Sequence, residues 1–573
     1  MFFSTLICSS LIGSSLAAVL PRHEPRAVAT ASPGCTNGPN SRQCWTDDFS
    51  IATDSETSWP VTGKTVSYHL EITNTTLAPD GTPKMMMAIN GQYPGPTIEA
   101  NWGDTVSVTI QNSMQDNGTT MHWHGIPQTG TNNMDGVSGI TECPIPPGGS
   151  RTYTFLANQH GTTWYHSHLS AQYGDGVVGP MVIHGPATAD YDIDLGALPF
   201  SDLYYPSAWE AAWSSETQGP PTADNAVING TNMNAAGTAG AYNKVTLKKG
   251  KKYRLRLVNM SLDNHFKVSL DGHQFTVIEA DFVPINPYQA DWLFMGIGQR
   301  YDVVFTADKD INSYWFRAEV QNGCGTNANN GKILSIFSYE GANSTTPTTI
   351  GSNYTQSCTD ETQLVPYYAK NVPKDQFINA RTLNVGGPTK VAATNTSASL
   401  FEWSLDGEPI SVDWQKPTLQ YVKDGDQNYT NELCVIELPD ADAWSFWVIQ
   451  SPVTFAVPHP IHLHGHDFFI LGSGSGNFTS VGSDALNFQN PPRRDVAMLP
   501  GAGWLVIAFL TDNPGAWLMH CHIAWHVGEG FAVQFLERAG DIPSTVDLSG
   551  LDSCAAWDAW YPTSPYKKDD SGL

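Results

Sequence analysis

The sequence contains 573 residues, of which 40% are hydrophobic, 11% are aromatic and only 15% are charged. This length predicts three or four structural units, and the shortage of charged residues favours a strand-rich secreted protein over a helical cytosolic one. The formal net charge of −26 argues against nucleic acid and anionic membranes as partners, because polyanions would be repelled.

The first 18 residues have the pattern of a signal peptide. An apolar run from Leu6 to Leu16 precedes the small residues Ala17 and Ala18, where a signal peptidase would cut, although no Lys or Arg stands before the run. Residues 19–34 then form a possible propeptide and N-terminal segment. No other stretch has the 18 uninterrupted apolar residues that a transmembrane helix needs. We therefore expect a soluble, secreted, extracellular protein without a membrane partner.

Potential N-glycosylation sites support secretion. An Asn-x-Ser/Thr sequon is a surface glycan acceptor in secreted proteins, and their density here predicts N-glycans, although any single site can be unused. The sequons begin at Asn74, Asn117, Asn229, Asn259, Asn343, Asn353, Asn395, Asn428 and Asn477.

The cysteine count is compatible with disulfides in an oxidising compartment. Removal of Cys8 with the signal peptide would leave eight cysteines, whose pairing the count alone leaves open.

Short alternating segments recur along the chain, bounded by Gly, Pro, Asn and Asp. Residues 105–112, 252–259, 300–307 and 503–510 each alternate apolar and polar side chains, which predicts half-buried strands. Helical periodicity is scarce, so the fold class is all-β. Polar, Pro-rich stretches near 185–190 and 341–373 are plausible joints between units. They divide the chain into domains at residues 35–188, 189–365 and 366–573.

Four His-x-His pairs are the strongest chemical signal. They are His122 and His124, His166 and His168, His462 and His464, and His520 and His522. On a strand both histidines of a pair point to the same face, so eight imidazoles can converge on one site. A single pair is weak support for a metal site, because strands often carry two histidines for packing. Four pairs make that explanation improbable.

Cys521 stands between His520 and His522, and in an extended segment it points to the opposite face. With His526 and the distant His459 it would supply two imidazoles and one thiolate, the donor set that selects blue copper. The alternatives, a buried free thiol or a disulfide partner, are disfavoured by the histidine-rich surroundings.

These motifs, HxHG, HxH, HPxHLHGH and HCHxxxH in this order, resemble those of multicopper oxidases, and the resemblance spans nearly the whole mature chain. It implies three cupredoxin-like Greek-key β-barrel domains. It also implies four coppers per chain: a type 1 copper in the third domain, and one type 2 and two type 3 coppers between the first and third domains.

The resemblance assigns roles by motif position. It implies that His459, Cys521 and His526 bind the type 1 copper and that His122 and His462 bind the type 2 copper. The type 3 ligands would be His124, His166, His168, His464, His520 and His522. The other histidines, such as His69, His160, His184, His273 and His466, are expected to be surface or core residues.

Phe531 occupies the position that lies axial to the type 1 copper in this family. Phenylalanine cannot coordinate, so the copper would keep three ligands and a relatively high potential. Ascorbate oxidases, bilirubin oxidases and most ferroxidases resemble one another in having Met there. Phe531 therefore points to a laccase, although a plain core role would be compatible with it.

Three further stretches, SLDNHFKVSLDGH from Ser261, NPPRRDV from Asn490 and the terminal DSGL, resemble laccases of the ascomycete type. In that comparison Asp263 borders the substrate pocket and accepts the phenolic proton, as a carboxylate that stays ionised at acidic pH. His526 and His265 share the pocket wall, although His265 could equally be structural, and Asp135 relays protons to bound oxygen. Without the resemblance, Asp263 and Asp135 would be interpreted as turn residues. Arg494 and Asp495 are interpreted as a structural ion pair.

The same resemblance implies three disulfides and the position of the tail. The disulfides would be Cys35–Cys44, Cys143–Cys554 and Cys324–Cys358, with Cys434 left free. The terminal residues 570–573 would insert into the solvent channel of the cluster without further cleavage.

The predicted function is therefore that of a laccase, which takes single electrons from phenolic or aromatic small molecules and reduces dioxygen to water. The alternatives are a bilirubin-oxidase-like enzyme or a metallo-oxidase with the same coppers. A non-enzymatic copper or electron-transfer protein is disfavoured, because it would not require eight paired histidines.

Overall fold

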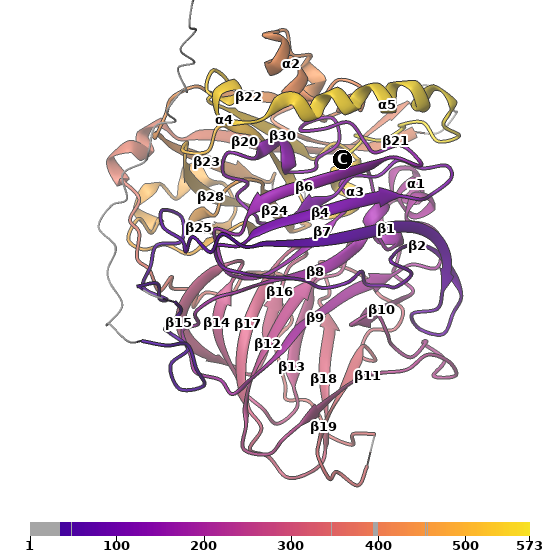
Figure 1. Ribbon diagram of the computed structural model, residues 1–573, viewed down its shortest axis with the longest axis vertical. Helices are drawn as coiled ribbons and strands as arrows, with labels where there is room; N and C mark the ends of the chain where they lie inside the picture. The colour runs from indigo at the N-terminus through magenta and orange to yellow at the C-terminus, as the bar shows by residue number, and fades with distance from the viewer. Residues whose placement is uncertain (1–34, 47, 345, 393–398, 453, 455) are drawn as a thin grey trace, which may run out of the picture.

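The computed structural model describes residues 35–573 except 47, 345, 393–398, 453 and 455. The predicted signal peptide at 1–18 and the segment 19–34 lie outside the described residues. The described part confirms the all-β prediction, with three pairs of sheets that follow one another along the chain (Figure 1).

The first pair of sheets is built by the strands that precede residue 185. One sheet has the order β2-β1-β4-β6 and the other β3-β8-β7-β5. Their bounds are β1 (Thr65–Leu77), β2 (Lys84–Ile89), β3 (Ile98–Asn101), β4 (Thr105–Asn112), β5 (His122–Trp123), β6 (Ser150–Leu156), β7 (Gly161–His166) and β8 (Val178–His184).

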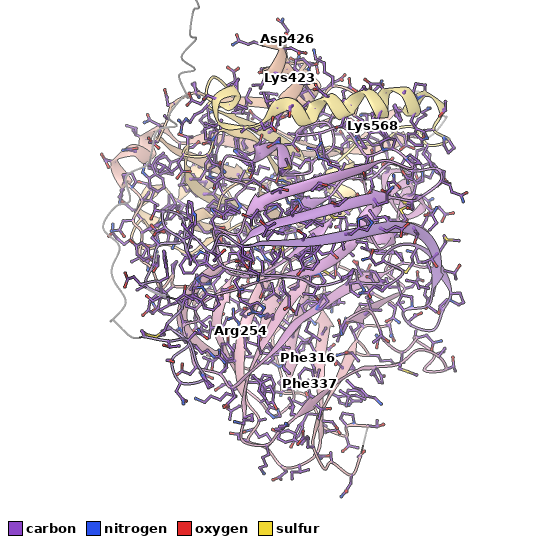
Figure 2. The ribbon with its side chains drawn as sticks, viewed as in Figure 1. Arg254, Phe316, Phe337, Lys423, Asp426 and Lys568 are labelled. Carbon is purple, nitrogen blue, oxygen red and sulfur yellow. A yellow bond between two sulfur atoms is a disulfide. The ribbon has the colours of Figure 1, made fainter. Side chains whose placement is uncertain are left out.

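The second pair occupies the lower part of Figure 1, and its sheets have the orders β10-β9-β12-β17-β14-β15 and β11-β19-β18-β13-β16. The bounds are β9 (Ile193–Leu203), β10 (Asn225–Ile228), β11 (Asn243–Leu247), β12 (Lys252–Asn259), β13 (Phe266–Leu270), β14 (Phe275–Ala280), β15 (Val283–Ala290), β16 (Leu293–Met295), β17 (Arg300–Thr306), β18 (Ser313–Val320) and β19 (Leu334–Tyr339). Phe316 and Phe337, labelled in Figure 2, stack in its core with ring centroids 5.7 Å apart.

The third pair has the orders β21-β20-β23-β28-β25-β26 and β22-β30-β29-β24-β27. The bounds are β20 (Arg381–Ala392), β21 (Ser399–Leu405), β22 (Val435–Leu438), β23 (Trp444–Gln450), β24 (His459–Leu463), β25 (Phe468–Ser475), β26 (Arg493–Arg494), β27 (Val496–Leu499), β28 (Gly503–Leu510), β29 (Gly515–Cys521) and β30 (Ala532–Glu537). The division at residues 35–188, 189–365 and 366–573 stays a prediction.

The α-helices among the described residues are short. They are α1 (Ala208–Gln218), α2 (Thr418–Asp424), α3 (Ala524–Gly528), α4 (Ile542–Thr545) and α5 (Cys554–Trp560). Helix α3 is buried. Among the described residues no helix is long and apolar enough to cross a membrane.

The predicted strands coincide with real ones, but their burial differs. Strand β4 alternates half-buried and buried side chains as expected, whereas β12 and β28 are buried on nearly their whole length. The polar face of β12 is covered because Arg256 donates a hydrogen bond of 2.9 Å to Thr162 Oγ1 on β7, in the first pair of sheets. Polar alternation here marks an interface between units and not a solvent-exposed face.

The three units share a core. One buried cluster joins Trp164 of β7, Val258 of β12 and Ile461 of β24, so side chains from all three pairs of sheets pack together. The disulfide Cys143–Cys554 adds a covalent link between the first unit and α5. The structure also joins Cys35 to Cys44 and Cys324 to Cys358, which are the pairings that the resemblance implied.

Candidate metal centres

The end of strand β29 and the residue after it direct three consecutive side chains to two sites. Cys521 faces His459 and His526, whereas His520 groups with His168 and His464 on the other side. This follows from the alternation of side chains along an extended chain. The sequence therefore predicted correctly that Cys521 and its neighbours point to opposite faces.

The first site is a compact set of one sulfur and two nitrogens. Cys521 Sγ lies 3.6 Å from His459 Nδ1 and 3.5 Å from His526 Nδ1, and the two nitrogens are 3.1 Å apart. Burial lowers the pKa of both imidazoles, that of His526 to about 3, and raises the pKa of the Cys521 thiol. Neutral imidazoles and a thiol that needs a nearby cation to ionise form a set that fits copper.

Phe531 closes this site on one side. Its fully buried ring lies 4.8 Å from the His459 ring, measured between centroids, and stacks on Trp403 at 5.7 Å. The Phe531 carbonyl also accepts a hydrogen bond of 3.1 Å from the Cys521 backbone amide. The residue at this position therefore contacts the donor set but offers it no ligand atom.

The second site gathers the eight paired histidines. Their ligand atoms form three groups, within each of which all atoms lie within 4.8 Å of one another. The groups are His122, His124 and His462; His124, His166 and His522; and His168, His464 and His520. All eight side chains are at least 96% buried.

Several of these imidazole nitrogens have no partner in the protein. Among the described residues, the Nε2 atoms of His122, His166, His168 and His462 are buried and accept or donate no hydrogen bond. Burial lowers the pKa of His166, His168 and His462 well below its ordinary value, so these rings are neutral and present lone pairs. Buried polar atoms without a partner require one, and a cluster of imidazoles fits copper ions.

Asp135 orients two rings of the second site. Its Oδ2 lies 2.8 Å from His464 Nδ1, and its backbone carbonyl lies 2.8 Å from His122 Nδ1. The residue follows the short 3-10 helix η1 (Asn132–Met134) and is 1% exposed. The structure places this carboxylate beside the histidines, and the turn geometry is what holds it there.

Asp495 also orients the rings, and the interpretation of Arg494 and Asp495 as one ion pair is wrong. Asp495 accepts two hydrogen bonds of 2.6 Å from Arg300 and lies 3.1 Å from His124 Nε2, while Arg494 pairs with Asp281 at 2.7 Å. Neighbouring residues of an extended segment point in opposite directions, so they rarely pair with each other. Burial raises the pKa of Asp495 to about 6, against the opposing effect of Arg300.

The two sites are connected through the backbone of β29. Cys521 belongs to the first site, and it is bonded to His520 and His522 of the second. The His520 ring adds a hydrogen bond, because its Nδ1 lies 2.9 Å from the Cys521 carbonyl oxygen. An electron at the first site has a short covalent route to the second.

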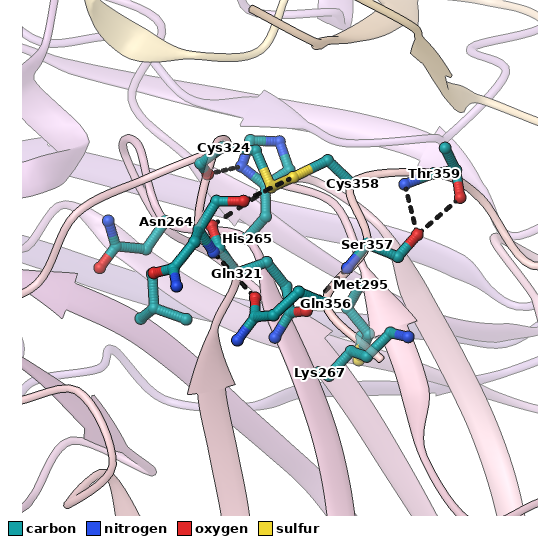
Figure 3. Close-up of a disulfide and its surroundings, with 12 residues drawn as sticks. Asn264, His265, Lys267, Met295, Gln321, Cys324, Gln356, Ser357, Cys358 and Thr359 are labelled. Atoms are coloured by element: carbon teal, nitrogen blue, oxygen red, sulfur yellow. Dashed lines mark hydrogen bonds between the residues drawn. A yellow bond between two sulfur atoms is a disulfide. The ribbon is translucent and has the colours of Figure 1, made fainter. Parts of the chain in front are cut away.

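Asp263 and His265 lie beside the first site. Asp263 is 9% exposed, and the His265 ring is fully buried and donates a hydrogen bond of 2.7 Å to the Cys324 carbonyl (Figure 3). The adjoining disulfide Cys324–Cys358 holds this loop in place. Asp263 and the 4% exposed His526 thus keep a small exposed edge, whereas His265 has none.

The expectation that Asp263 stays ionised at acidic pH is wrong. Burial, assisted by the neighbouring Asp202, raises the pKa of Asp263 to about 7. Asp202 is a residue that sequence reasoning missed, because its partners lie 60 residues away. Its carboxylate accepts backbone hydrogen bonds of 2.8–2.9 Å from Leu262, Asp263 and Asn264 and so fixes the Asp263 loop.

The carboxyl terminus ends inside the molecule. Leu573 is 1% exposed and lines a small cavity together with His166, His168 and His520, and the terminus is marked within the outline in Figure 1. The backbone amide of Val412 donates to the Ser571 carbonyl at 2.9 Å and so anchors the tail. The tail thus reaches the second site.

The remaining histidines stay apart from both sites. In the described part of the chain, none of the metal-type groups includes His69, His160, His184, His273 or His466. The free cysteine Cys434 also lies outside them.

Comparison with family models gives a consistent match across the chain. Three models, each described as multicopper oxidase, match residues 71–188, 196–342 and 411–541. Each match falls on one pair of sheets, and β20 and β21 lie outside the matched ranges.

Individual relatives and a solved structure agree with the models. The chain is 55% identical to Laccase-3 of Botryotinia fuckeliana over 77% of this chain and all of that protein. It is 45% identical to a laccase of Cryphonectria parasitica over 100% of this chain and 99% of that protein. The crystal structure of a laccase from Botrytis aclada superimposes with a TM-score of 0.88 at 40% identity, covering 94% of this chain and all of that one.

Proposed function

Because this chain belongs to the multicopper oxidase family, with three cupredoxin-like domains, we propose that it works as a laccase. It would oxidise phenol-like molecules one electron at a time at one copper centre and reduce dioxygen to water at another. The observation that carries this proposal is the sharing of β29, where Cys521 serves one donor set and its two neighbours serve the other.

The donor sets divide into four copper positions. His459, Cys521 and His526 would hold a type 1 copper, and His122 and His462 a type 2 copper. Two type 3 coppers would be held by His124, His166 and His522, and by His168, His464 and His520, which are separate groups in the structure. When bound, copper accepts and passes single electrons at the first centre and stores them for oxygen reduction at the second.

The protein's own side chains would orient the imidazole rings of the ligands and accept or pass protons. Asp135 and Asp495 fix the orientation of His464, His122 and His124 by hydrogen bonds, as carboxylates do around many metal sites. Asp135 would also pass protons toward bound oxygen. At the other centre, Asp263 would accept the proton that a phenol loses with its electron.

We expect Asp263→Asn to slow phenol oxidation most at neutral and higher pH. Only the ionised carboxylate accepts a proton, and a pKa of about 7 means that the ionised fraction grows as the pH rises through 7. The ratio of variant to wild-type rate should be near unity at pH 4.5 and should fall about tenfold or more by pH 8, since a general base contributes at least this order. Steady-state rates with 2,6-dimethoxyphenol measure it.

A donor that loses an electron without a proton provides the control. For an azine sulfonate dye, the variant-to-wild-type ratio should stay flat over the same pH range. A ratio for the phenol that is equally flat would contradict the role of Asp263 as a base and leave it a structural turn residue.

Phe531→Met tests the axial position. Because the Phe531 ring lies against the His459 ring, a thioether there would approach the donor set and would supply a further weak ligand. We expect the potential of the type 1 copper to fall, as measured by redox titration of the blue absorption. An unchanged or higher potential would show that a side chain at 531 does not reach the metal.

A metallo-oxidase or bilirubin-type enzyme is the competing assignment, because it would use the same coppers. The non-coordinating Phe531 favours the laccase, since the other classes resemble one another in having Met there. Rates on a dimethoxyphenol, ascorbate, bilirubin and ferrous ion, compared under air, separate the possibilities. The laccase assignment requires the phenol to be the best donor of the four.

Secretion and glycosylation complete the proposal. The sequon asparagines Asn74, Asn229, Asn343, Asn353, Asn428 and Asn477 are exposed. Asn259 is fully buried and donates hydrogen bonds to Asn264 and Met295, so it cannot carry a glycan, and Asn395 lies outside the described residues. N-glycans at the exposed sites would accompany an extracellular enzyme.

A further inference from the structure

A cavity lies between α1 and the carboxyl-terminal tail, apart from both metal centres. Its volume is about 50 Å³. Trp209, Trp213 and Glu216 line it and are spaced by four and three residues, which places them on one face of α1. Ala208 and Ala211 on another face of α1 are buried in the shared core. The helix thus presents two aromatic rings and one carboxylate to the cavity.

The tail forms the opposite wall. Tyr566, Asp569 and Asp570 line the cavity from that side, and the rings of Tyr566 and Trp209 are 6.0 Å apart between centroids. Tyr566 is 43% exposed, so this end of the cavity opens to solvent. A ligand could enter there without displacing the tail.

Glu216 is an unpartnered buried carboxylate. It is 6% exposed, and its Oε2 has no hydrogen-bond partner among the described residues. The charges that act on it come from Asp570, Asp569 and Glu529, which are all negative. Burying a carboxylate beside like charges is costly unless a positive group compensates it.

The basic groups nearby are already engaged. Lys568 donates hydrogen bonds to Ser411 Oγ at 2.6 Å and to the Asp570 carbonyl at 3.3 Å. Asp175, which lines the cavity, pairs with Lys84 at 3.0 Å. In the described part of the chain, Glu216 has no ion pair. The chain itself therefore leaves the place beside Glu216 open to a positive group from a ligand.

The shape and chemistry favour an organic cation over a metal ion. In the described residues, no three donor atoms of Glu216, Asp569 and Asp570 come close enough to share an ion. The walls contain indole and phenol rings, which attract ammonium groups and pack against aromatic ligands. An N–H donor would also satisfy Glu216 Oε2.

We propose that this cavity binds an arylalkylammonium ion, whose ammonium group donates a hydrogen bond to Glu216 and whose ring packs against Trp209 and Trp213. The ammonium compensates the cluster of carboxylates, and the ring fills the aromatic end. The site is distinct from the edge of the type 1 centre where phenols are oxidised.

Binding should be linked to pH. Burial, Asp570 and Asp569 raise the pKa of Glu216 to about 9, so Glu216 holds a proton at pH 7 when the cavity is free. A bound ammonium favours the ionised carboxylate, so the proton must leave. The other groups facing the cluster are Asp569, Asp570, Glu529 and Lys568, and burial raises the pKa of the three acids and lowers that of the lysine. Affinity should therefore increase from pH 6 to pH 9.

Calorimetry with 2-phenylethylammonium on the copper-loaded full chain tests the proposal. We expect Glu216→Gln to weaken binding about tenfold or more, because a hydrogen bond to a charged group contributes on this order. Trp213→Leu should weaken it as well, and benzyltrimethylammonium, which lacks N–H donors, should bind less tightly to the wild type. Titration in two buffers of different ionisation enthalpy should reveal proton release at pH 7.

Glu402→Gln is the matched control. Glu402 lines the neighbouring cavity, which Glu216, Asp569 and Asp570 also line, but it does not line this one. The variant therefore removes a nearby carboxylate that does not face the ligand. Its affinity should stay near that of the wild type. Equal losses of affinity in Glu216→Gln and Glu402→Gln would show that only long-range attraction is at work and would contradict the proposed site. Undiminished binding to Glu216→Gln and Trp213→Leu would also overturn it.

Discussion

Replacing Cys521 with serine should abolish the visible thiolate absorption and phenol oxidation together. Cys521 supplies the one soft donor of the first site, and a serine hydroxyl is a poor ligand for copper. We expect the oxidation rate to fall on the order of a thousandfold or more, as when one member of a catalytic unit is lost. The absorption spectrum and the copper content per chain, measured by mass spectrometry, should both show the loss of one copper.

Cys434→Ser is the control for this experiment. Cys434 is the other free cysteine in the described residues, is partly exposed and lies outside both metal centres. That variant should keep the absorption and the activity. If Cys521→Ser retained the blue band, the assignment of the thiolate ligand would be refuted.

The largest effect on stability is expected from Arg300→Met. The guanidinium is 1% exposed, binds both carboxylate oxygens of Asp495 at 2.6 Å and donates a further bond to the Thr162 carbonyl at 3.1 Å. Its removal leaves the Asp495 carboxylate buried without its partner. Breaking a buried ion pair in this way costs about 3–5 kcal/mol. The midpoint of urea unfolding should decrease accordingly.

Lys423→Met provides the comparison for an exposed pair. Lys423 lies on α2 at the surface, where Figure 2 labels it, and its 2.7 Å pair with Asp552 is open to solvent. Such pairs contribute about 0–1 kcal/mol, so the midpoint should hardly move. Equal shifts in the two variants would show that Arg300 contributes no more than an exposed ion pair.

The sequence was sufficient to predict the fold class and the gathering of the histidines, because both follow from local periodicity. Alternation along an extended chain separates Cys521 from His520, whatever the rest of the fold does. Alternation cannot show which His-x-His pair lies beside which other pair in the folded chain. That His124 lies with His166 and His522 depends on how the first and third pairs of sheets dock.

Polar contacts between distant parts of the chain could not be predicted either, because they depend on how the sheets dock. Nothing local connects Arg300 with Asp495, which are 195 residues apart, or Asp202 with the loop at Asp263. Burial is also a property of the whole fold. It raises the pKa of Asp263 and removes Asn259 from the usable sequons, although both residues have ordinary local sequences.

The stoichiometry of oxygen consumption tests the central claim most directly. If Cys521 passes single electrons to a neighbouring centre that stores them, four phenols should be oxidised for each dioxygen consumed, and added catalase should return no oxygen. Two phenols per dioxygen, with oxygen released by catalase from hydrogen peroxide, would contradict the proposed division between the two centres.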